Sequence, residues 1–167
     1  MKQNMKDFFL RCRIFEIFLI LLVFIFRLTP HLANFSPVLA VWAYQGNKKI
    51  NPWFLAIALF ITDIILGLSP ILLWVWFSYG LIWLISRRLS WLKRGVISAC
   101  LFFIITNLGV YAAGWYSSIW TCYSMALPFF IRSLIATIGF SGLIYALERI
   151  GMMQSLPIRK VSLSFAD

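Results

Sequence analysis

Six apolar runs divide this chain, and they leave few ways in which it can fold. The runs cover residues 14–29, 37–47, 52–68, 70–86, 95–113 and 121–147. Hydrophobic residues make up 62% of the chain, whereas soluble domains contain about 45–50%. A helix of about 20 residues crosses a bilayer, because it rises about 1.5 Å per residue. The chain is therefore predicted to be an all-α integral membrane protein.

The placement of the fifteen Lys and Arg residues predicts how these runs are threaded. If every run crosses and the N-terminus is cytoplasmic, all of them except Arg27 and Arg132 fall on the cytoplasmic side. Such a bias is typical of multi-pass membrane proteins. We therefore expect a six-helix transmembrane bundle in a bacterial inner membrane, with both termini cytoplasmic. Residues 1–13 would form a basic N-terminus, 14–148 the transmembrane domain and 149–167 a cytoplasmic tail.

The second run is too short to cross a bilayer unless the chain before it already lies below the outer surface. Its eleven residues reach only about 16 Å. Pro30 and Pro37 bracket a segment that cannot be regular helix. Non-helical backbone at membrane depth survives only where protein buries it or where it lines a wet cavity. We expect an inward-folded loop over 30–37; the alternative is an ordinary surface loop before an underlength helix.

Polar and charged side chains in this apolar setting are the candidate binding residues, since such groups are costly at membrane depth and commonly functional. The threading places five of them in the outer half of the membrane, although they come from distant parts of the chain, and a sixth, Asn34, belongs to the loop. They are Arg27, His31, Asn34, Asp63, Asn107 and Arg132. Their convergence predicts a solute cavity, in which Arg132 is best placed to meet an anionic group.

Several of these residues also have a purely structural interpretation. Asp63 and Arg132 could form an ion pair, and Arg27 could extend to the outer headgroups. Asn107 could make an interhelical hydrogen bond, and His31 could bond the loop backbone. Taken singly, each interpretation is as good as a binding role.

The sequence lacks the motifs of common enzyme classes. It contains no G-x-x-x-x-G-K-[ST] phosphate loop, no H-E-x-x-H and no G-x-S-x-G. One histidine and three scattered cysteines supply no set of metal ligands. We therefore expect no enzyme activity, metal or cofactor. Nucleic-acid binding is disfavoured too, because the basic residues lie between apolar runs, as in proteins that face lipid headgroups.

Four motifs resemble those of an uncharacterised bacterial family of small membrane transport proteins. They are Arg27-x-x-Pro30-His31-x-x-Asn34-Phe35-Ser36-Pro37, Asp63-x-x-Leu66-Gly67, Phe103-x-x-Thr106-Asn107-x-Gly109-Val110 and Ala126-x-Pro128-Phe129-Phe130. The resemblance extends from Arg27 to Tyr145. The layout is also similar to that of the substrate-binding S components of energy-coupling factor (ECF) vitamin transporters.

The similarity to S components implies an uptake protein that holds a small polar, vitamin-like micronutrient in an outward-facing cavity. It also implies an ECF-type energising module as a partner. S components commonly dock to that partner through an A-x-x-x-A pattern on the first helix, whereas residues 14–26 contain no alanine. This difference puts the partner in question. The alternative is a structural or assembly subunit of a larger membrane complex, with no ligand of its own.

Overall fold

The computed structural model describes residues 17–29, 35–48 and 52–149, and these residues are almost entirely helical. The helices are the first helix (Ile17–Leu28), α2 (Val38–Lys48), α3 (Trp53–Leu66), α4 (Leu72–Ile85), the short 3-10 helix η2 (Ser86–Arg88), α5 (Trp91–Ala112) and α6 (Ile119–Leu147). No strand occurs in this part of the chain. The all-α prediction is confirmed, and each of the six apolar runs overlaps one α-helix.

Among the described helices, α5 and α6 are long and apolar enough to cross a membrane. They contain 22 and 29 residues. Only 22% of the most apolar stretch of each is buried inside the protein. A core helix of a soluble protein would be mostly buried, so the exposed apolar surface favours membrane association. The first helix and α3 are apolar but shorter.

Helix α5 begins one turn before the predicted run 95–113. Ser90 precedes the helix in an extended conformation, and its carbonyl oxygen accepts a hydrogen bond from the backbone N–H of Arg94 at 2.9 Å. Arg94 is therefore part of the helix, and its side chain is only 8% exposed. The apolar run therefore marks the helix but not its first turn, because that turn contains the basic residues Lys93 and Arg94.

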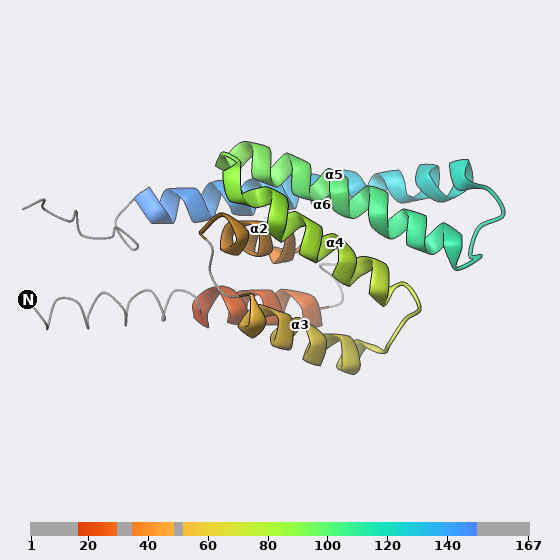
Figure 1. Cartoon of the computed structure of the whole chain (residues 1–167), viewed down its shortest axis with the longest axis horizontal. Helices are drawn as coiled ribbons and strands as arrows, with labels where there is room; N and C mark the ends of the chain where they lie inside the picture. The colour runs from red at the N-terminus through yellow and green to blue at the C-terminus, as the bar shows by residue number, and fades with distance from the viewer. Residues whose placement is uncertain (1–16, 30–34, 49–51, 150–167) are drawn as a thin grey trace, which may run out of the picture.

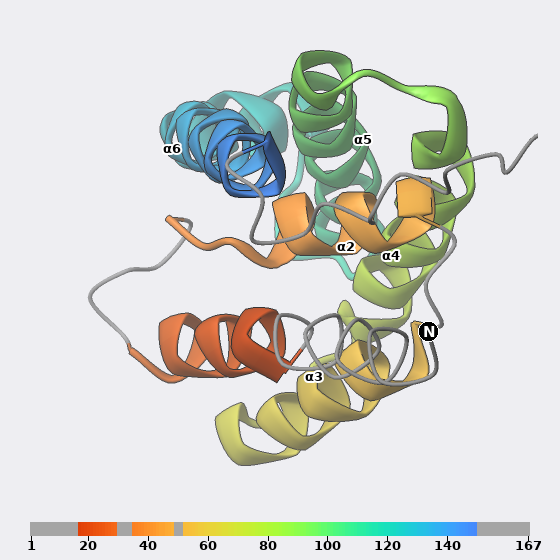
Figure 2. The ribbon, with the colours of Figure 1, turned by 90° about the vertical axis from the view of Figure 1, so that its left-hand side faces the viewer.

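Helix α2 lies between two layers of helices (Figure 2). One layer contains α5 and α6, the other contains the first helix and α3, and α4 runs obliquely beside α2. Nine of the eleven α2 residues are buried, and Val41 and Ala43 are completely inaccessible. Gly46 permits a close approach to α4, since a Cβ there would overlap the carbonyl oxygen of Trp83. The shortest predicted span is thus the centre of the fold.

The end of the first helix and the start of α2 both lie opposite the middle of α5 and α6 (Figure 1). Phe26 and Phe35 contact the same ring, that of Phe140 on α6, with centroids 5.4 and 6.0 Å away. Pro37 is fully buried. The predicted inward-folded loop joins these points, but its residues 30–34 lie outside the described residues.

Candidate functional site

Asp63 on α3 is the centre of a buried polar cluster. Its side chain is 2% exposed and pairs through Oδ1 with Nη2 of Arg27, at the end of the first helix. The indole Nε1 of Trp76, on α4, donates to the other carboxylate oxygen at 3.1 Å. Both oxygens of the carboxylate therefore have partners from different helices, which is the arrangement that makes a buried charge tolerable.

Tyr79 connects this cluster to α5. Nη1 of Arg27 donates to the hydroxyl of Tyr79 at 3.5 Å, and the Tyr79 ring stacks on Phe102 with centroids 5.6 Å apart. Trp42 of α2 donates through Nε1 to the carbonyl oxygen of Tyr79 and lies 5.3 Å from its ring. Tyr79 thus contacts both the polar cluster and the aromatic surface of α5.

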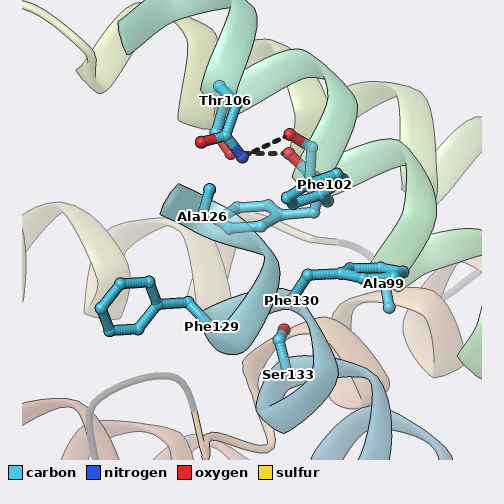
Figure 3. Close-up of a pocket in the computed structure, with 9 residues that line it drawn as sticks. Ala99, Phe102, Thr106, Ala126, Phe129, Phe130 and Ser133 are labelled. Carbon is cyan, nitrogen blue, oxygen red and sulfur yellow. Dashed lines mark hydrogen bonds between the residues drawn. The ribbon is translucent and has the colours of Figure 1, made fainter. Parts of the chain in front are cut away.

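A cavity of about 270 Å³ lies between α5 and α6. Its walls come from two sets of residues that repeat at helical spacing. They are Ala99, Phe102, Phe103, Thr106 and Asn107 on α5, and Ala126, Phe129, Phe130 and Ser133 on α6 (Figure 3). The rings of Phe103 and Phe130 lie 4.5 Å apart across the interface. The cavity is therefore largely aromatic, with three polar side chains.

The polar side chains of the cavity retain hydrogen-bond acceptors. Thr106 Oγ1 donates to the carbonyl of Phe102, and Asn107 Nδ2 donates to that of Phe103, each at 2.7 Å (Figure 3). In these bonds the Thr106 hydroxyl and the Asn107 amide nitrogen act as donors. The lone pairs of Thr106 Oγ1 and Asn107 Oδ1 therefore remain available to accept further hydrogen bonds. No described residue donates to Asn107 Oδ1 or bonds the hydroxyl of Ser133. A bound molecule with a donor group could satisfy these oxygens.

The structure does not gather the described members of the predicted binding set into one place. Arg27 and Asp63 lie together, and Asn107 lines the α5–α6 cavity. Arg132 is exposed on α6, and the partner of Asp63 is Arg27 rather than Arg132. His31 and Asn34 lie outside the described residues.

The sequence prediction did not include Trp76, Phe102 and Ser133, which belong to these two sites. A signal for the cavity was present, because its lining residues follow the i, i+3, i+4, i+7 spacing of one helix face. On α5 this stripe runs from Ala99 to Asn107, and on α6 from Ala126 to Ser133. Apolar stripes of this kind usually indicate packing, so the pattern alone does not reveal a cavity.

A family model described as a family of unknown function (DUF6580) matches residues 10–156. The match covers most of the chain, which therefore belongs to this family. The family description assigns no activity. No curated protein matches the chain, and no solved structure matches it.

Proposed function

We propose that this DUF6580-family protein is a six-span bacterial inner-membrane protein that binds a small, vitamin-like solute for uptake. The exposed apolar surfaces of α5 and α6 support insertion. Basic residues support cytoplasmic placement of one end of the bundle, where α2, η2 and α6 end and α5 begins (Figure 1). Those described there are Lys48, Arg87, Arg88, Lys93, Arg94 and Arg149.

The α5–α6 cavity is the observation on which this proposal rests. Its volume is close to the lower limit of about 300 Å³ for small-molecule sites. A cavity of about 150 Å³ in another protein holds benzene, so this one is suited to a somewhat larger molecule. Phenyl walls beside the acceptors of Thr106 and Asn107 favour a flat, mostly apolar ring that carries a hydrogen-bond donor.

The contacts around Phe102 give the bound solute a route to the rest of the bundle. Phe102 lines the cavity and stacks on Tyr79, which contacts Arg27. A solute seated against Phe102 would restrict the Tyr79 ring and thereby the ion pair between the first helix and α3. Solute binding is then expected to stabilise helices that do not line the cavity.

Binding can be tested on the purified full chain in detergent. Native mass spectrometry would detect a co-purified small molecule, and thermal unfolding would be followed with riboflavin, thiamine, biotin, pyridoxal and nicotinate in turn. We expect a bound mass or a raised unfolding temperature with at least one compound. The absence of both a bound mass and a thermal shift across the whole panel would refute the proposal.

A matched pair of substitutions on α6 locates the binding site. Ala126→Trp fills the cavity and should abolish the bound mass and the thermal shift. Ala146→Trp adds the same side chain at an exposed position of the same helix and should preserve both. Equal losses in the two variants would place the solute elsewhere.

A second candidate function is that of a structural or assembly subunit in a larger membrane complex. Arg132 favours it, because a charged side chain on the outer surface of a membrane helix needs a partner. Full cellular function in the Ala126→Trp variant, together with a stable complex of fixed stoichiometry, would support this candidate over solute binding.

A further inference from the structure

Arg132 lies on the outer surface of α6, one of the two described helices that are long and apolar enough to cross a membrane. It is exposed on α6, and its flanking residue Ile131 is 50% exposed. It makes no hydrogen bond, ion pair or cation–π contact with any residue that the structure describes. The charge therefore has no partner among the described residues.

Contacts between α5 and α6 define the depth of Arg132. On one side of it, Phe130 contacts Phe103 at 4.5 Å between ring centroids. On the other side, Ile138 lies against Gly95. A Cβ added to Gly95 would be 3.1 Å from the Cα of Ile138. Arg132 is thus level with the middle of the 22-residue α5, about 15 Å from either end.

That depth makes the usual way of accommodating a membrane arginine costly. Arginine near a helix end extends easily to the headgroups, whereas a residue at the centre of a span reaches them only with local bilayer thinning and water defects. Intramembrane charges instead pair with another charge or face water inside a bundle. Because Arg132 faces outward and no described residue pairs with it, its partner lies outside the described residues.

The surface around Arg132 has the form of a helix-packing seam. Residues at alternating three- and four-residue spacing make a continuous stripe along α6, as in left-handed helix pairs. The members are Met125, Pro128, Arg132, Ile135 and Gly139, and all are exposed. A Cβ on Gly139 would have no atom within 4 Å, so another backbone can approach closely there.

We infer that this stripe, which we call the Arg132 seam, binds a transmembrane helix of another protein that carries an Asp or Glu at mid-membrane depth. The inference rests on the membrane insertion proposed above, but not on solute binding. A carboxylate satisfies both the charge and the planar donors of arginine. A second copy of this chain does not suit the seam. Symmetry would bring two Arg132 side chains together, and the carboxylates of the described residues, Asp63 and Glu148, are already paired.

Synthetic helices provide a test that does not require the natural partner. The full chain is reconstituted in phosphatidylcholine nanodiscs with a polyleucine helix that bears one central Glu, and association is measured by energy transfer. We expect this helix to associate about tenfold more tightly than one with a central Leu, as for polar contacts between membrane helices. Arg132→Leu should abolish the difference, whereas Lys93→Leu, at an exposed position of α5, should retain it.

Two further measurements separate the possible outcomes. An Ile135→Cys variant should react no faster than the parent protein with a membrane-impermeant maleimide; faster reaction would show that α6 faces water and would refute insertion itself. A preference for the Glu helix that persists in Arg132→Leu would overturn only the inference about the seam. If the parent protein forms dimers and Arg132→Leu abolishes them, the Arg132 seam binds a second copy of this chain. That result would also overturn the inference about a different partner protein.

Discussion

Arg27 and Asp63 form a buried ion pair that joins the end of the first helix to α3. Asp63 is 2% exposed, while Arg27 is 19% exposed. Trp76 donates to the second carboxylate oxygen, and Tyr79 accepts from the guanidinium. The pair thus fixes the position of the first helix against two others, α3 and α4.

Removing the arginine should destabilise the fold much more than removing the pair. Arg27→Leu leaves the Asp63 carboxylate buried without its counter-charge, which should lower the free energy of unfolding by about 3 kcal/mol. This is the low end of the range for buried pairs, because Arg27 is partly exposed. Denaturant titration in detergent would measure it. In Arg27→Leu/Asp63→Asn, the amide oxygen can still accept from Trp76, and most of the loss should be recovered. A double variant as unstable as the single one would contradict the role of the pair.

Two tryptophans should respond differently to the same substitution. Trp42 Nε1 donates to the Tyr79 carbonyl, whereas Trp83 Nε1 is buried and has no hydrogen-bond partner in the described structure. Trp42→Phe should therefore cost about 1 kcal/mol more unfolding free energy than Trp83→Phe, since only the first loses a hydrogen bond. Chemical denaturation of the two variants side by side would test this. Equal destabilisation would show that ring volume, rather than the hydrogen bond, determines the effect.

Gly46 should tolerate no side chain. A Cβ there would overlap the backbone of Trp83, which cannot move without shifting α4. Gly46→Ala should lower the free energy of unfolding by about 1–3 kcal/mol. Gly80→Ala is the matched control, because a Cβ at Gly80 has no atom within 4 Å; alanine should stabilise that helix by up to about 1 kcal/mol. If Gly46→Ala leaves the free energy of unfolding unchanged, α2 and α4 are less closely packed than described.

The positions of the helices could be predicted from sequence because apolar runs and helix-breaking residues define them locally. Pro52 precedes α3, and Gly67 with Pro70 separates α3 from α4. The start of α5 could not be predicted in the same way. The apolar run begins only after Arg94, and the backbone hydrogen bond from Arg94 to Ser90 shows that the helix begins before it.

The candidate site was less predictable, because it depends on which helices are neighbours. Asp63 and Arg27 were each conspicuous as charges among apolar residues, but the sequence suggested Arg132 as the partner of Asp63 and the headgroups as the surroundings of Arg27. The packing of the first helix against α3 instead pairs Arg27 with Asp63. The same limit applies to the cavity: Phe102 and Phe129 lie on apolar helix faces, and only the interface between α5 and α6 shows that space remains there.

The orientation of α5 can be tested at its two ends. Ser90 precedes the helix beside a basic segment, and Ser117 follows it in a connection without Lys or Arg. The charge bias therefore predicts that Ser90 is cytoplasmic and Ser117 is outside. Both residues are exposed, and Ser90 makes no side-chain cap bond that a substitution would remove. In intact cells, Ser117→Cys should react with an impermeant maleimide, while Ser90→Cys should react only after permeabilisation, with the parent protein as baseline. The reverse labelling pattern would show that the bundle has the opposite orientation. Labelling of both cysteines from one side would show that α5 does not cross the membrane.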